Sequence, residues 1–213
     1  ATFSAMNIRI EDGFYVFDVK MATETIENIQ FGLPGHHNLS NALIALAMAK
    51  TYGVSNEDIK SSLASFKGVR RRFSFQIRNE KLVYIDDYAH HPTEINAVHQ
   101  AVRELYPNKK VLAIFQPHLF SRTKDFVDGF AESLSKFDEI GLMDIYPARE
   151  LPIEGVTSTW LLEKITNTNK HLVQKEELLD FINKSTFDVL VTIGAGDIGE
   201  MVKDIKSALY EED

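Results

Sequence analysis

The sequence contains no cysteine among its 213 residues, which excludes disulfide bonds, thiolate metal sites and cysteine nucleophiles. No glycine is followed by lysine, so this stretch carries no Walker-type phosphate-binding loop. We find no secretory signal pattern and no apolar run long enough to cross a bilayer. These absences fit a protein of the reducing cytoplasm, and a cytoplasmic location is what we expect.

The composition is that of an ordinary soluble globular protein, with 44% hydrophobic and 25% charged residues. The formal net charge of −8 argues against nucleic acid or an anionic membrane as a general partner. A local basic patch would still suit a phosphorylated small molecule. The length allows one large domain or two small ones.

The first 31 residues read as β-rich. Apolar residues at 6–10 and 14–19 flank Glu11-Asp12-Gly13 and predict a hairpin, and a third strand is expected at 24–31. Two helices should follow, at Ala42–Tyr52 and Ser55–Phe66. We expect Asn38 or Ser40 to cap the first of them and Ser55 to cap the second.

After residue 73 the pattern changes to strands that alternate with helices, following a hairpin. Strands are predicted at 73–77, 82–85, 111–115, 139–143, 171–173 and 189–193, and helices at 92–105, 123–135, 158–165, 176–182 and 198–209. The pattern predicts an α/β fold with a mostly parallel sheet and helices on both faces, preceded by a small α+β part. We place the boundary at residue 70, which gives domains 1–70 and 71–213.

Polar side chains gather where the strand at 82–85 ends, in Asp86, Asp87, Tyr88, His90 and His91. A helix should begin directly after them at Pro92, because proline suits the first helical position. Four ionisable groups within six positions exceed what helix capping needs. Ligands of open α/β sheets bind at the carboxyl ends of the strands, so we expect a functional site here.

Two further segments belong to the same predicted edge. Phe115-Gln116-Pro117-His118-Leu119-Phe120-Ser121-Arg122 leaves the strand at 111–115. Arg122 stands at a helix start, where a cation opposes the helix dipole, so we favour a ligand contact for it. The three arginines at 70–72 fit either a solvated run or an anion clamp.

Glycines mark two tight turns. Gly194-Ala-Gly196-Asp-Ile-Gly199 has the spacing of a dinucleotide fingerprint, but no second strand with an acidic end follows it. We therefore expect a tight turn between strand and helix rather than NAD binding. Gly32–Asn41 places histidines and asparagines before a helix, which fits turn and cap chemistry or a nucleotide site equally well.

These motifs together resemble the Mur ligase family of peptidoglycan synthesis. The resemblance rests on five blocks that span residues 32 to 198: Gly-Leu-Pro-Gly-His-His-Asn-Leu-Ser-Asn-Ala, Gly-Val-Arg-Arg-Arg-Phe, Asp-Asp-Tyr-Ala-His-His-Pro-Thr-Glu-Ile, Phe-Gln-Pro-His-Leu-Phe-Ser-Arg-Thr and Gly-Ala-Gly-Asp-Ile. The resemblance implies a ligase that joins L-alanine to UDP-N-acetylmuramate. The resemblance implies that residues 71–213 form its C-terminal Rossmann-like domain and residues 1–70 the tail of its central domain.

The resemblance also implies cofactors and site residues. ATP and Mg²⁺ would serve the reaction, which passes through an acyl phosphate, and the fragment alone would be inactive without its P-loop half and UDP-sugar domain. Arg72 would contact the nucleotide phosphates and, with His90, belong to the catalytic group. The remaining implied contacts are Asn38 and Asn41 to adenine, Asp87 to ribose, and His90, His91, His118 and Arg122 to the incoming amino acid. No metal ligand is assigned. Leu119 departs from the arginine that many members carry at this position.

Three other functions remain open from the sequence. A murein peptide ligase of cell-wall recycling would use the same UDP-sugar with a peptide. A metal-dependent hydrolase would use Asp86, Asp87, His90 and His91, although no further cluster of ligands is evident. A nucleotide-binding module without catalysis is the third.

Overall fold

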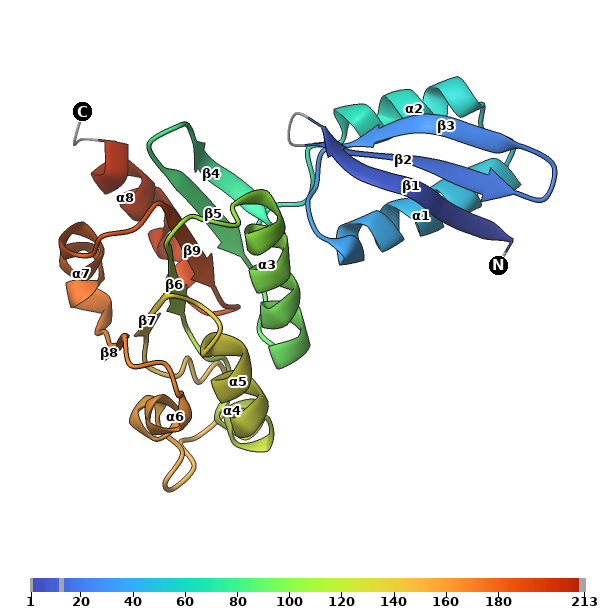
Figure 1. Ribbon diagram of the computed structural model, residues 1–213. Helices are drawn as coiled ribbons and strands as arrows, with labels where there is room; N and C mark the ends of the chain where they lie inside the picture. Colours follow the sequence, from blue (N-terminus) through green and yellow to red (C-terminus); the bar gives the residue numbers. More distant parts are fainter. Residues whose placement is uncertain (1, 12–13, 211–213) are drawn as a thin grey trace. The chain divides into compact units, whose positions relative to one another are not determined.

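The computed structural model describes residues 2–11 and 14–210, and the chain divides into two compact units (Figure 1). The first comprises the residues up to Val69 together with Gln100–Pro107, and the second comprises Arg70–His99 and the residues from Asn108 onward. Asp12 and Gly13 of the predicted turn lie outside the described residues. No described helix has the length and apolar character needed to cross a membrane.

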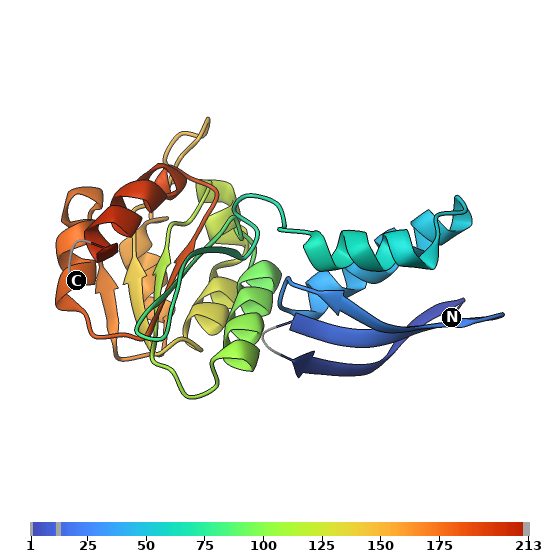
Figure 2. The same cartoon turned by 90° about the horizontal axis from the view of Figure 1, so that it is seen from above.

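The first unit contains a three-stranded antiparallel sheet in the order β1-β2-β3. Its strands are β1 (Phe3–Glu11), β2 (Phe14–Met21) and β3 (Thr25–Phe31), as the alternating pattern predicted. Apolar side chains of β2 and β3 such as Phe17 and Ile29 are fully buried. They form one core with two helices, α1 (His36–Thr51) and α2 (Asn56–Ser65), which lie on the same face of the sheet (Figure 2).

Helix α1 spans His36–Thr51 and therefore begins six residues before the predicted start at Ala42. The predicted side-chain caps are wrong, because Gly35 occupies the N-cap position without a side-chain bond. Both polar residues instead lie inside the helix: the Asn38 amide donates to the Pro34 carbonyl at 2.7 Å and the Ser40 hydroxyl donates to that of His36 at 2.9 Å. Such local bonds let short polar side chains sit within a first turn.

Helix α2 (Asn56–Ser65) begins as predicted, because the Ser55 hydroxyl accepts the backbone N–H of Asp58 at 3.1 Å.

The second unit contains a six-stranded sheet in the order β4-β5-β9-β6-β7-β8. Strand β4 is antiparallel to β5, and all the other neighbours are parallel. The strands are β4 (Ser74–Arg78), β5 (Val83–Asp87), β6 (Val111–Phe115), β7 (Glu139–Leu142), β8 (Lys170–Leu172) and β9 (Val189–Ile193).

The helices that alternate with these strands follow the predicted pattern, with two differences. They are α3 (Pro92–Leu105), α4 (Phe120–Asp125), α5 (Val127–Leu134), α6 (Ser158–Lys164), α7 (Leu178–Lys184) and α8 (Ile198–Tyr210). The single helix predicted at 123–135 is two helices, because Phe126 leaves the helical conformation with φ −118° and ψ 20°. The predicted helix at 176–182 begins as a 3-10 turn at Lys175–Glu177.

Strands β5, β6, β7 and β9 are buried on both faces, whereas the edge strand β8 is largely exposed. Alternate residues such as Leu112 and Leu190 pack with α7 and α8 on one face. On the other face Phe115 of β6 contacts Phe130 of α5 with ring centroids 5.5 Å apart, and α3 lies alongside (Figure 1). The predicted mostly parallel sheet with helices on both faces is confirmed. The loops after β5, β6 and β9 lie together at the carboxyl ends of these strands.

Candidate functional site

The sheet order brings three polar segments to one edge. Strand β9 lies between β5 and β6, so the turn after Ile193 lies between the loops that follow Asp87 and Phe115. Backbone bonds join them, since Gly194 N–H donates to the Asp87 carbonyl at 3.1 Å and Gln116 N–H donates to that of Ile193 at 3.0 Å. The carboxyl ends of parallel strands form the crevice in which such sheets bind ligands.

Asp86 and Asp87 are the last two residues of β5. The sequence pattern had instead placed both of them after the strand. Asp87 is 5% exposed, and its two carboxylate oxygens accept the N–H groups of Phe73 and Ala89, each at 2.7 Å. Burial raises the pKa of Asp87 to about 6, although both backbone bonds act to lower it. Asp87 therefore joins the start of β4 to the loop after β5 through its two backbone bonds.

Asp86 faces a different set of partners. Its carboxylate accepts Arg71 Nε at 3.0 Å and the Thr192 hydroxyl at 2.9 Å. Burial raises the pKa of Asp86, and the Arg71 guanidinium acts against that rise. Arg71 Nη2 also donates to the Gly194 carbonyl at 2.6 Å, and its guanidinium lies over the Tyr88 ring at 5.1 Å. Arg71 and Asp86 thus connect the beginning of the second unit to the glycine turn.

Arg72, the neighbour of Arg71, points into a more open environment. Its side chain is 51% exposed and its Nη1 lies 3.9 Å from Glu94 Oε1. Its guanidinium also lies 5.8 Å from the centre of the Tyr88 ring. The arginine run is therefore neither uniformly solvated nor a uniform clamp: Arg71 is structural, and Arg72 can reach an anion. The sequence did not single out Arg71, because its partner Gly194 lies 123 residues away.

His90 and His118 come together from β5 and β6, with ring centroids 6.4 Å apart. His90 Nδ1 lies 2.9 Å from the Tyr88 carbonyl oxygen, which can only accept, so this nitrogen carries a proton. His118 stacks on Tyr146 at 5.7 Å, and its Nδ1 is buried without a hydrogen-bond partner in the described part of the chain. Burial, followed by the positive charge of Arg122, lowers the pKa of His118, so its ring is neutral near pH 7.

His91 and Arg122 differ in the contacts that they make with other residues. His91 Nδ1 accepts the N–H of Thr93 at 3.3 Å at the start of α3, and its ring contacts Phe126 at 4.6 Å. Arg122 has no ion-pair partner within residues 2–11 and 14–210. Its helix is fixed by Glu150, which accepts the N–H and the hydroxyl of Ser121 at 2.9 and 2.5 Å. Leu119 is the N-cap residue of that helix and has a φ of 75°.

The turn between Gly194 and Gly199 is filled by a side chain. Gln116 Oε1 accepts the N–H of Ile198 at 2.9 Å, and Gln116 Nε2 donates to Asp197 at 2.6 Å. A Cβ atom on Gly194, where φ is 148°, would lie 2.7 Å from the Gln116 carbonyl oxygen. Glycine at position 194 therefore permits the close approach of the two loops. Gln116 accepts a backbone N–H at the start of α8 that a bound pyrophosphate would need as a donor.

Asn38 and Asn41 belong to the first unit, on α1. Asn38 is partly buried and Asn41 is exposed. Neither forms part of the edge described above, which lies in the second unit.

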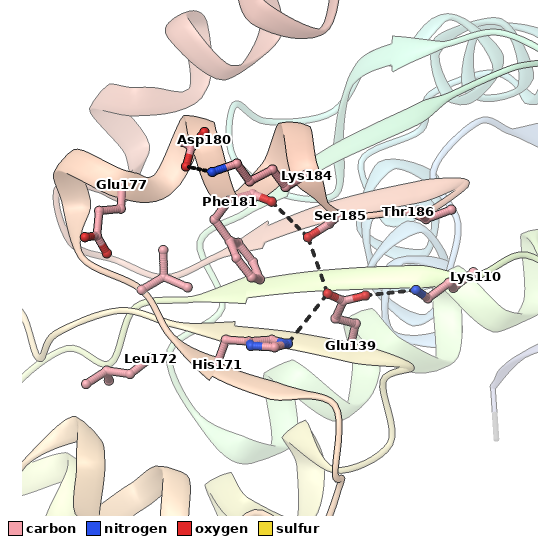
Figure 3. A pocket seen from close by; sticks show the side chains of 11 residues that line it. Lys110, Glu139, His171, Leu172, Glu177, Asp180, Phe181, Lys184, Ser185 and Thr186 are labelled. Carbon is pink, nitrogen blue, oxygen red and sulfur yellow. Dashed lines mark hydrogen bonds and ion pairs between the residues drawn. The ribbon is translucent and has the colours of Figure 1, made fainter.

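Cavities lie at both ends of the strands of the second sheet. One of about 240 Å³ adjoins the carboxyl edge, between Gln116, Tyr146, Lys175 and Asp197. The other, of about 570 Å³, lies at the amino ends of β6 and β7 (Figure 3). Its central Glu139 accepts Lys110 Nζ at 2.9 Å and the Ser185 hydroxyl at 3.3 Å.

No metal centre accompanies these residues. Within residues 2–11 and 14–210 no group of three or more His, Asp or Glu is placed to hold a metal ion. Asp86 and Asp87 are engaged by Arg71, Thr192 and backbone N–H groups. This geometry does not favour the metal-dependent hydrolase.

Comparison with known proteins places this edge in a family. Residues 71–196 match the model of the Mur ligase C-terminal domain, described as "Mur ligase, glutamate ligase domain". The chain belongs to the Mur ligase family. Mur ligases are ATP-dependent ligases, and the matched residues, from Arg71 to Gly196, include the loops after β5 and β6 and the first part of the glycine turn after β9.

Curated relatives of high identity carry one name. A UDP-N-acetylmuramate–L-alanine ligase of Flavobacterium psychrophilum is 70% identical over 210 residues, which are 99% of this chain and 47% of the relative. A protein of the same name from Phocaeicola vulgatus is 48% identical over 99% of this chain and 46% of the relative. The chain spans about half the length of the curated relatives it matches.

Solved structures agree with the fold. A UDP-N-acetylmuramate–alanine ligase from Thermotoga maritima superposes with a TM-score of 0.84 at 25% identity, covering 100% of this chain and 46% of that one. A murein peptide ligase from Psychrobacter arcticus has a TM-score of 0.63 at 22% identity, covering 98% of this chain and 44% of that one. The second likeness shows the fold alone, so the comparisons do not favour the recycling enzyme.

Proposed function

We propose that this chain is the C-terminal part of an ATP-dependent ligase that joins L-alanine to UDP-N-acetylmuramate. The observation that carries the proposal is the 70% identity to a relative of that name over 99% of the chain. The reaction would be the formation of an amide bond between an acid and an amino acid. ATP first phosphorylates the muramyl carboxylate, the amine of L-alanine then attacks the acyl phosphate, and phosphate leaves.

The carboxyl edge offers suitable groups for the second step. L-Alanine must lose a proton from its ammonium group before it can attack, and the neutral His118 beside His90 can accept one. Arg122, which has no ion-pair partner in the described chain, suits the alanine carboxylate. In this proposal His91 acts indirectly, by fixing the start of α3, whose Glu94 accepts the N–H of His90 at 2.8 Å.

Nucleotide contacts are proposed for four residues. The half-exposed Arg72 would offset negative charge on the phosphates, which develops further as the phosphoryl group is transferred. Asp87 would accept a ribose hydroxyl with the lone pairs that its two backbone bonds leave over. Asn38 and Asn41 would approach adenine. The described residues do not form a Mg²⁺ site, so we assign this ion to no residue of the chain and derive no step from it.

The test uses the intact protein to which this chain belongs. ADP formation should require both UDP-N-acetylmuramate and L-alanine, and the 213-residue chain alone should form none. The control replaces L-alanine with the cell-wall tripeptide that a murein peptide ligase would accept. ADP formation with the tripeptide and not with L-alanine would overturn the proposal, and so would activity of the chain by itself.

A further inference from the structure

The loop after β7 runs alongside the loop after β6, which carries His118. Tyr146 N–H donates to the Pro117 carbonyl at 2.8 Å, and Leu119 N–H donates to the Tyr146 carbonyl at 2.9 Å. These bonds continue the parallel pairing of β6 and β7 beyond the ends of both strands, with His118 opposite Tyr146. The residues directly after Tyr146 are therefore held beside the loop of the proposed amino-acid contacts.

A tight turn follows at Pro147–Glu150. Glu150 N–H donates to the Pro147 carbonyl at 2.9 Å, and Ala148 has a left-handed φ of 51°. The Glu150 carboxylate accepts the N–H and the hydroxyl of Ser121 at 2.9 and 2.5 Å. Arg149 is the third residue of this turn, so these bonds keep its backbone close to the start of α4.

Arg149 is a second cation of this edge that no other side chain neutralises. Its side chain is exposed and has neither an ion pair nor a hydrogen bond in the described part of the chain. Arg122 of α4 also lacks an ion pair within residues 2–11 and 14–210. Both differ from Arg71, which is bound to the buried Asp86. A guanidinium presents its donors in a planar fork that matches a carboxylate, so both arginines are available to an anion.

The two arginines act on the same histidine. Burial, and then the charges of Arg122 and His90, lower the pKa of His118, and Arg149 lowers it further. Glu150 acts in the opposite direction, but its carboxylate is already bonded to the start of α4. Like charges that converge on one place are unfavourable, and a shared anion would stabilise both.

The loop that carries His118 lacks a cation that many Mur ligases have. Leu119 stands where those members carry arginine, and the side chain of Leu119 is partly buried. Its backbone N–H bonds to Tyr146, three residues before Arg149. Since the two loops are bonded to each other at this point, a charge that is missing from one loop can be supplied by the other.

We propose that Arg149 is a further substrate-binding residue, which together with Arg122 holds the carboxylate of the incoming amino acid. A carboxylate has two oxygens with about four lone-pair sites, so it can accept both guanidinium groups at once. The inference deepens the proposed function and rests on it. It assigns to the loop after β7 a contact that the sequence motifs place in the loop after β6.

The two arginines also distinguish a free amino acid from a peptide. In a peptide, the carboxyl group of the first residue is part of an amide bond and carries no charge. A bound peptide would therefore leave both guanidinium groups without an anion, and this cost disfavours that class of substrate. Arg149 is thus a specificity-determining residue for a free α-carboxylate.

The test compares variants of the intact protein with the parent. Arg149→Gln removes the cation from the turn. Arg78→Gln removes the same charge at an exposed position opposite Val83, at the amino end of β5, and is the matched control. Leu119→Arg, added to Arg149→Gln, returns a cation to the other of the two bonded loops. ADP formation is measured against the concentration of L-alanine, with ATP and UDP-N-acetylmuramate saturating.

The KM for L-alanine should rise at least about fivefold in Arg149→Gln with kcat changed less than about twofold, because a contact of the bound substrate is lost. Leu119→Arg should recover most of that rise, and Arg78→Gln should match the parent. An unchanged KM in Arg149→Gln, an equal rise in Arg78→Gln, or no recovery by Leu119→Arg would overturn the inference. A parent that forms no ADP with L-alanine would instead overturn the proposed function, so the two failures are distinguishable.

Discussion

The amino and carboxyl edges of the six-stranded sheet, formed by the two ends of its parallel strands, both carry charged side chains. The two edges differ in how far the hydrogen bonds and ion pairs of these side chains are satisfied. At the amino edge, Glu139, the central carboxylate of the cavity, is paired with Lys110 and Ser185 (Figure 3). At the carboxyl edge, His118 Nδ1 is buried without a partner in the described part of the chain, and Arg122 has no ion pair there. A polar cluster that satisfies itself needs no ligand, whereas an incomplete one is suited to bind.

The carboxyl edge itself combines paired and unpaired groups, and the largest expected effect separates them. Arg71→Ala leaves the 1% exposed Asp86 without its cation and should cost about 3 kcal/mol of unfolding free energy, because a buried carboxylate loses its partner. Arg72→Ala, its neighbour, should cost less than about 1 kcal/mol because its ion pair is exposed. Urea unfolding of the chain measures both. Equal losses would mean that Arg71 is not the structural arginine.

The pH dependence of stability sharpens the distinction for Asp87. Its pKa in the folded protein is raised to about 6, above the unfolded value, so its favourable contribution is present at low pH and is lost as pH rises through about 6. The parent's advantage over Asp87→Asn should therefore shrink by about 2–3 kcal/mol between about pH 4 and pH 7. Unfolding of both proteins across this range gives the difference. An advantage that grows with pH would show that Asp87 prefers to be charged in the folded state.

At the amino edge, a substitution should affect stability without affecting catalysis. Glu139→Gln weakens the bonds to Lys110 and Ser185 and should cost about 1–2 kcal/mol of unfolding free energy. The kcat and KM of the intact ligase should not change. Glu163→Gln, at an exposed position of α6, is the control and should change neither property. Loss of activity in Glu139→Gln at unchanged stability would assign a functional role to the amino edge.

Local signals in the sequence predicted most of the elements. Helix α3 begins at Pro92 as predicted, because proline's fixed φ and missing N–H suit the first helical position. Strands β6 and β9 were evident as short apolar runs between polar loops. The start of α1 was missed, because Gly35 caps it without a side-chain bond and leaves no pattern to recognise.

The site was predicted only in part, for a different reason. The polar residues after β5 and β6 indicate a ligand-binding edge of the sheet, since strand ends are local features of the sequence. The partners of those residues are not local: Arg71 bonds to Gly194, and Gln116 fills the turn before α8, 82 residues further along. These long-range bonds alone show which carboxylate is structural. They also show which arginine remains available to bind a ligand.

We propose that the carboxyl ends of the strands bind the incoming amino acid. The KM for L-alanine of the intact protein that carries Arg122→Ala measures this binding. Lys124→Ala, at an exposed position of the same helix, is the matched control. We predict that Arg122→Ala raises this KM at least about tenfold, since a charge-assisted contact to a carboxylate is lost, while Lys124→Ala leaves it unchanged. An unchanged KM in Arg122→Ala, or an equal rise in both variants, would show that Arg122 does not bind the amino acid.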